Sequence, residues 1–226
     1  MKIKGLLIKK ILKIASISLS LLLSIGLFLF LAIYPSKRHS VNLASPSFTV
    51  SHESGVYKEP FELRISTINN NFYIRYTLDG SEPTSKSNLY TKPIKIDKSS
   101  VVRFAFFLNE NIEGDSNTKV YVLNKHTVPT VFLVTDPANL WDPVNGIYVV
   151  GEDKKTPNYT KKGDTWQRLA ELFYFDENGN LAIEMPVEIR ISGGTTRNHP
   201  QKTLRVCAKE SLGFRSINYD FFGDGA

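Results

Sequence analysis

Acidic residues are missing from the first 52 positions of this 226-residue chain, whereas five lysines stand before Ile14. The whole sequence has 28 Lys and Arg against 22 Asp and Glu, a net charge of +6. Subtracting the five lysines from the 28 leaves 23 basic residues, which almost balances the 22 acidic ones. The positive charge therefore belongs to a basic tip, and we expect no nucleic-acid partner. The five residues are Lys2, Lys4, Lys9, Lys10 and Lys13.

Cysteine is almost absent as well, since Cys207 is the only one. A single cysteine excludes an intramolecular disulfide. The four histidines are His39, His52, His126 and His199, and their wide separation in the sequence gives no zinc-ligand spacing. The GxSxG elbow of α/β-hydrolases is also missing. We predict no metal site and no catalytic residue.

Charge is absent again from residues 14–34, IASISLSLLLSIGLFLFLAIY, a run of 21 residues. At about 1.5 Å per residue a helix of this length matches the hydrocarbon core of a bilayer. The lysines on its amino side predict residues 1–13 in the cytoplasm and everything after residue 34 outside. We expect a single-pass signal anchor in the lipid bilayer, followed by a polar linker over 35–45. A cleaved signal peptide is the alternative.

Residues 46–125 contain short runs rich in β-branched and aromatic residues, separated by turn-forming clusters at roughly ten-residue spacing. Polar and apolar residues alternate along Tyr73–Leu78, as expected of a strand with one buried face. The pattern predicts a small antiparallel β-sandwich.

The segment YIRYTLDGSEPTSKSNLYTKPIKI, residues 73–96, resembles the C-terminal β-sandwich domain of chitobiase and β-hexosaminidase. This resemblance implies an accessory domain of a carbohydrate-active or surface protein, with cell-wall glycan or a surface protein as partner.

Two sites in the sandwich are open to alternative interpretations. The oxygens of Asp79, Ser81 and Glu82 could contribute to a calcium or sugar site, but a tight turn is favoured because two carboxylates are too few for calcium. Tyr57, Tyr73 and Tyr90 could form a sugar-stacking platform, although core positions are favoured.

Residues 126–226 begin a second region, which we expect to be a β-rich α+β module. A buried strand over 131–134, a helical start at Asp136-Pro137 and a hairpin joining WQRLAELFYF to LAIEMPVEIRIS are predicted. The runs VPTVFLVTDPANLWDPVNGIYV, ELFYFDENG, IRISGGTTRNHPQKTLRV and NYDFFG occur here in order. Together they resemble the amino-terminal part of the spore-coat protein H (CotH-like) kinase family. The resemblance implies a surface protein kinase that uses ATP and a divalent metal.

The run IRISGGTTRNHPQKTLRV places two glycines between two predicted strands, so that the backbone can approach a ligand closely. By family analogy this hairpin covers the phosphates of ATP, through Gly193, Gly194, Thr195, Thr196, Lys202 and Arg205. A plain glycine hairpin with surface cations is the alternative.

Phosphoryl transfer also needs acidic residues that the family supplies farther along the chain. We therefore expect a mainly β, membrane-anchored member of the family, truncated before its catalytic lobe and without kinase activity alone. ATP and a metal would bind only if the missing lobe were supplied. A surface protein that binds glycan through its sandwich is the alternative function.

Overall fold

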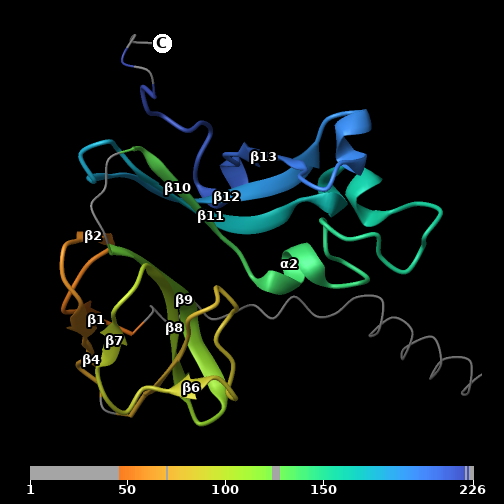
Figure 1. The fold of residues 1–226 in the computed structure, drawn as a ribbon. Coiled ribbons are helices and arrows are strands. Elements are labelled where there is room, and N and C mark those ends of the chain that lie inside the picture. The colour runs from red at the N-terminus through yellow and green to blue at the C-terminus, as the bar shows by residue number, and fades with distance from the viewer. Residues whose placement is uncertain (1–45, 70, 124–127, 222, 224–226) are drawn as a thin grey trace, which may run out of the picture. The chain divides into compact units, whose positions relative to one another are not determined.

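Most of the β-branched and aromatic runs form strands in the computed structural model, which describes residues 46–69, 71–123, 128–221 and 223. The protein is mainly β, with several sheets and almost no helix (Figure 1). The described residues all belong to one compact unit, residues 44–226. The expected tip, anchor and linker at 1–13, 14–34 and 35–45 lie outside the described residues. Within the described residues, no helix has the length and apolar character that crossing a bilayer requires.

The first part of the described chain, residues 46–123, is here called the sandwich. Its strands are β1 (Phe48–Val50), β2 (Gly55–Tyr57), β3 (Phe61–Leu63), β4 (Ile65–Thr67), β5 (Tyr73–Thr77), β6 (Asn88–Leu89), β7 (Ile94–Ile96), β8 (Ser100–Leu108) and β9 (Asn111–Leu123). Five strands form one sheet in the order β2-β9-β8-β5-β6, and β1-β4 and β3-β7 form two-stranded sheets. Antiparallel pairing was predicted throughout, but β2 runs parallel to β9. A parallel pair is possible here because the long intervening chain lets β9 return beside β2 in the same direction.

The sandwich core draws on most of its strands, and β8 is buried along six consecutive residues. Leu63, Ile74, Phe104 and Phe106 are buried between the sheets, and Phe48 meets the ring of Phe104 edge-on at 5.2 Å. Burial of these large apolar side chains is the main favourable contribution to folding.

The second module, residues 128–221, is built on one antiparallel sheet in the order β10-β11-β12-β13. The strands are β10 (Thr130–Val134), β11 (Arg168–Phe175), β12 (Leu181–Ser192) and β13 (Thr203–Cys207). The short helices are α2 (Pro137–Trp141), η1 (Asn158–Thr160), η2 (Asp164–Trp166), η3 (Thr195–Asn198) and η4 (Glu210–Leu212). Asp136 caps α2 by accepting the amide of Ala138 at 2.8 Å, as its position before Pro137 predicts.

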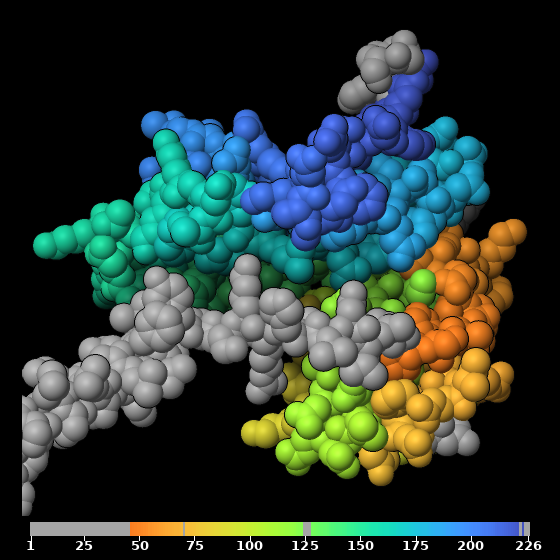
Figure 2. Space-filling view, turned by 180° about the vertical axis from the view of Figure 1, so that it is seen from behind, coloured from red at the N-terminus to blue at the C-terminus, as the bar shows by residue number. Residues whose placement is uncertain are grey.

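The sheet of the second module has two different faces. One face is apolar and packs against Ile147, Tyr159 and Trp166 from the segment between α2 and β11. Residues near the end of the chain cover the same face, where the rings of Tyr219 and Tyr174 lie 5.0 Å apart. Figure 2 shows this dark-blue segment lying on the light-blue strands. The other face carries the apolar side chains of Val134, Phe173 and Phe175 near β10 and β11, and the polar side chains of Glu188, Arg190 and Arg205 towards β13.

Candidate functional site

The hairpin between β12 and β13 turns at Gly193, whose φ is +104°. A side chain is disfavoured here by the positive φ, and a Cβ on Gly193 would also force the hydroxyl of Thr196 to move. Gly194 differs from its neighbour, since its φ is −97° and a Cβ there would meet open space. The positive φ requires a glycine at the first position, whereas at Gly194 only the ψ of −106° disfavours another residue.

The hairpin register brings two arginines face to face. Arg190 on β12 pairs with Arg205 on β13. Directly opposite residues on antiparallel strands have their Cβ atoms about 4.5–5.5 Å apart, and two like charges at such positions destabilise a sheet. Among the described residues, neither guanidinium has a hydrogen bond or an ion pair to offset this repulsion.

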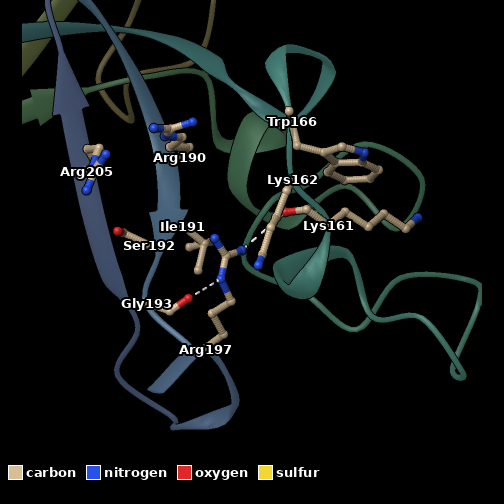
Figure 3. Close-up of a pocket in the computed structure, with 10 residues that line it drawn as sticks. Lys161, Lys162, Trp166, Arg190, Ile191, Ser192, Gly193, Arg197 and Arg205 are labelled. Atoms are coloured by element: carbon tan, nitrogen blue, oxygen red, sulfur yellow. Dashed lines mark hydrogen bonds between the residues drawn. The ribbon is translucent and has the colours of Figure 1, made fainter. Parts of the chain in front are cut away.

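The arginine pair forms one side of a cavity of about 260 Å³. Five of its lining residues are cations, and no described residue that lines it bears a carboxylate. In Figure 3, Arg190 and Arg205 stand on the two neighbouring strands, whereas Lys161, Lys162 and Trp166 come from a separate segment. The lining residues are Lys161, Lys162, Gly163, Trp166, Arg190, Ile191, Ser192, Gly193, Arg197 and Arg205.

Asn158 organises the far wall of the cavity. This residue is only 2 % exposed, and its amide nitrogen donates to the carbonyls of Pro143, Val144 and Gly146 at 3.1–3.3 Å. Its side-chain oxygen accepts from Lys161 Nζ at 2.9 Å. Because one buried amide satisfies several backbone groups, it fixes the path of the segment that carries the wall lysines.

Two of the five cations are already engaged. Lys161 Nζ lies 4.3 Å from the ring centroid of Trp166, in addition to its bond with the Asn158 side chain. Arg197 donates from Nε to Gly193 O at 2.7 Å and from Nη1 to the carbonyls of Tyr159 and Lys161 at 3.0 and 3.2 Å. Arg197 therefore ties the hairpin to the far wall.

Three cations remain for a ligand, namely Lys162, Arg190 and Arg205, none of which has a hydrogen bond or ion pair within the described chain. Glu188, the next acidic residue on the same face of β12, already pairs with Lys209 Nζ at 2.6 Å. The arrangement is therefore one that an oxyanion can neutralise.

Only some of the six residues that the sequence suggested for phosphate binding line the cavity. Gly193 and Arg205 line the cavity, whereas Gly194, Thr195 and Thr196 lie in the turn beside it without lining it. Lys202 points elsewhere, since its Nζ donates to His199 O at 2.8 Å and lies 4.1 Å from the ring centroid of Tyr159. Lys202 and Arg205 are three residues apart in an extended segment and so face opposite sides of the sheet.

Sequence reasoning missed four of the five cations that line the cavity, Lys161, Lys162, Arg190 and Arg197. The sequence contains no usable signal for the pairing of Arg190, because Ser192 pairs with Thr203 across the connection 193–202, whereas a tight turn at Gly193 would set Arg190 opposite Arg197. Lys162 also lacks a signal, because a long loop separates it from the hairpin.

The acidic turn of the sandwich is held by bonds within the protein. Asp79 accepts from the amide and the hydroxyl of Ser81 at 3.0 and 2.6 Å, and these bonds lower the pKa of its carboxyl. Glu82 binds the buried Arg103. No group of three or more acidic, histidine or cysteine residues able to hold a metal ion occurs among the described residues. The two bonds from Ser81 to Asp79 agree with the turn interpretation.

The three sandwich tyrosines do not form one platform. The hydroxyl of Tyr57 donates to Glu53 O at 2.7 Å, and that of Tyr90 accepts the amide of Ile65 at 3.0 Å. Both side chains pack against the sandwich core. Tyr73 is the exposed one, at 57 %.

A polar cluster joins the sandwich to β11 of the second module. Arg103, which is 6 % exposed, donates to Gly80 O at 3.0 Å and to Glu171 at 3.4 Å. Glu171 also accepts from the Thr118 hydroxyl at 2.6 Å. Burial raises the pKa of the Glu171 carboxyl, and the bond from Thr118 and the charge of Arg103 offset only part of that rise.

The comparisons with known proteins bear on the sandwich. Comparison with curated proteins found no match, and comparison with solved structures found none either. Residues 52–119 match the family model described as "Chitobiase/beta-hexosaminidase C-terminal domain". The match covers less than half of the chain and gives no support to the kinase resemblance of residues 126–226. The chain therefore carries a β-sandwich domain of the chitobiase/β-hexosaminidase C-terminal type.

Proposed function

We propose that this protein binds a phosphate-bearing anion at the cavity beside the β12–β13 hairpin. The observation that carries the proposal is the placing of Arg190 directly opposite Arg205, in a cavity whose described lining has no carboxylate. Guanidinium groups match the geometry of phosphate oxygens and bind them with two parallel hydrogen bonds. A bound dianion turns the repulsion between the two arginines into attraction.

The proposal retains one part of the resemblance to CotH-like kinases. In it, the hairpin with Gly193 supplies the phosphate-binding element of the second module, and Arg205 keeps its expected role. Lys202 loses that role, because its ammonium group is engaged by His199 O and the ring of Tyr159. The proposed activity of this chain alone is binding and not transfer, because the described lining offers no carboxylate to position an acceptor hydroxyl.

A thermal-shift series on the full chain tests the proposal. Orthophosphate and pyrophosphate should raise the melting temperature of the wild type at constant ionic strength, because a ligand that binds only the native state stabilises it. Arg190→Gln should remove the shift. Lys92→Ala is the control, since Lys92 is exposed on the sandwich, and it should keep the shift. Equal shifts in both variants would contradict a specific site.

A second function rests on the family match of residues 52–119. We propose that the sandwich holds the protein on a cell-wall glycan, with the exposed Tyr73 as its stacking residue. Retention on insoluble polysaccharide should fall for Tyr73→Ala and stay unchanged for Lys92→Ala. Equal retention of both variants would remove Tyr73 from this role.

Binding to a cell-wall glycan requires the described domains to lie outside the cytoplasm, which we propose on the charge and apolar pattern of residues 1–34. Protease added to intact cells should then degrade the domains after residue 45. The chain should also stay with the membrane fraction after a high-salt wash. Protection from protease in intact cells would contradict this topology.

A further inference from the structure

The resemblance to CotH-like kinases implies a nucleotide bound together with a divalent metal, and the cavity can be tested for its fit to such a metal. Magnesium and calcium bind oxygen ligands and favour carboxylates. The described lining contains five cationic side chains and no carboxylate. One of its carbonyl oxygens, Gly193 O, already accepts from Arg197 Nε at 2.7 Å. The residues present do not fit a divalent metal.

We propose that the cavity binds its phosphate group free of divalent metal, so that its ligand class is an uncomplexed phosphomonoester or pyrophosphate. This inference rests on the proposed function and names the form in which the ligand binds. Lys162, Arg190 and Arg205 take the charge-neutralising role that a metal ion has in most phosphoryl-transfer sites.

Charge balance is the first argument for a metal-free ligand. A magnesium complex carries two fewer negative charges than the free phosphate, so it neutralises less of the repulsion between Arg190 and Arg205. It also brings a dication next to guanidinium groups in a partly enclosed space, where charges are screened less than in bulk water. Both effects favour the free anion over its metal complex.

Two acidic residues near the cavity already have partners, which also disfavours a bound metal. Glu188 is two positions before Arg190 on the same face of β12, but its carboxylate is held by Lys209 Nζ at 2.6 Å. The acidic side chain of Asp164 is also committed, because it accepts from Gln167 Nε2 at 2.7 Å. A metal ion would therefore have to break an existing contact to recruit either carboxylate.

Isothermal titration of the full chain with pyrophosphate tests the inference, first with a chelator and then with saturating Mg²⁺ at matched ionic strength. Pyrophosphate binds Mg²⁺ tightly, so binding of the free anion alone should make the apparent Kd at least about tenfold weaker with Mg²⁺. Orthophosphate, which binds Mg²⁺ weakly, serves as the control ligand and should keep its affinity. An unchanged affinity for orthophosphate would show that Mg²⁺ does not act on the cavity directly.

The outcomes separate this inference from the proposed function. Equal or tighter pyrophosphate binding with Mg²⁺ would overturn the metal-free ligand and leave the anion site standing. Absence of binding in both buffers would overturn the anion site and this inference with it. Arg205→Gln should weaken pyrophosphate binding in the chelator buffer, whereas Lys92→Ala should leave both titrations as in the wild type.

Discussion

Arg190 and Arg205 form an unfavourable pair in a protein that could have placed a neutral residue at either position. Directly opposite like charges in a sheet cost stability, and neither guanidinium has a described partner that offsets the cost. A cost of this kind is typical of functional sites, where local stability is exchanged for binding. Removing one arginine of the pair should therefore raise the stability of the protein and weaken its binding of phosphate.

Arg205→Gln should stabilise the ligand-free protein by roughly 0.2–1 kcal/mol, because it removes the repulsion across the strand pair. The same change should weaken phosphate binding. Chemical denaturation in phosphate-free buffer measures the first effect. A loss of stability, with Lys92→Ala as the neutral control, would show that Arg205 is an ordinary structural residue.

Asn158 stabilises the protein, in contrast to the arginine pair, because its side chain donates hydrogen bonds to backbone carbonyls of the loop. Asn158→Ala should lower the free energy of unfolding by about 2 kcal/mol, since it leaves the carbonyls of Val144 and Gly146 without their donor. The carbonyl of Pro143 keeps the amide of Glu152 at 3.2 Å. Asn88→Ala is the matched control, since Asn88 is exposed and should tolerate the change. A cost below that of the control would mean that the loop does not depend on this amide.

At the scale of elements, the turn between β12 and β13 contains two adjacent glycines with different requirements. Gly193→Ala should cost about 1–2 kcal/mol of stability, because its φ of +104° is unfavourable for alanine and its Cβ would strike Thr196. Gly194→Ala should cost less, because its φ is negative and its Cβ would enter open space, so that only its ψ of −106° opposes an alanine. Urea unfolding of both variants measures the difference, and equal costs would contradict the observed turn.

The contact between β9 and β11 makes the stability depend on pH through Glu171. Because the folded-state pKa of this carboxyl is raised above 4.5, its contribution is fully present below pH 4.5 and is lost as the pH rises through the folded value. The stability of the wild type relative to Glu171→Gln should therefore fall as the pH is raised from about 4.5. Glu110→Gln, at an exposed position, should show no such trend. A rise in the stability of the wild type relative to Glu171→Gln over this pH range would contradict a raised pKa of Glu171.

At the scale of the whole molecule, the sandwich and the second module share an apolar cluster. Val120 of β9 packs in one group with Val134, Phe173 and Phe175 of the second sheet. Parts that share a buried core are expected to unfold together. The sandwich is therefore an integral part of the unit formed by residues 44–226.

This shared core predicts one unfolding transition. Both tryptophans, Trp141 and Trp166, lie in the second module, so their fluorescence reports that module, whereas far-ultraviolet circular dichroism reports both. The two signals should give the same urea midpoint. In Phe173→Ala both midpoints should fall together, by an amount equivalent to about 3–5 kcal/mol. Separate midpoints in the wild type would contradict the shared core.

Much of the fold was predictable because its signals are local. Alternation along Tyr73–Leu78 and the turn after Phe175 indicated strands that the structure contains. The cavity was harder to predict, because it depends on contacts distant in sequence. Arg197 donates to the carbonyl of Gly193 and to that of Lys161, which lies 36 positions before Arg197, and no pattern of composition or spacing encodes such a contact. The role expected of Lys202 overlooked strand alternation, which sends it to the opposite face from Arg205.

The central claim is that the arginine pair of the β12–β13 hairpin binds phosphate. The most direct test is calorimetric titration of pyrophosphate, without divalent metal, into the wild type, Arg190→Gln and Lys92→Ala. We predict saturable binding to the wild type and to Lys92→Ala, and a dissociation constant at least about tenfold weaker for Arg190→Gln, because a charge-assisted contact is lost. Identical constants for all three proteins, or no heat of binding to the wild type, would contradict the account.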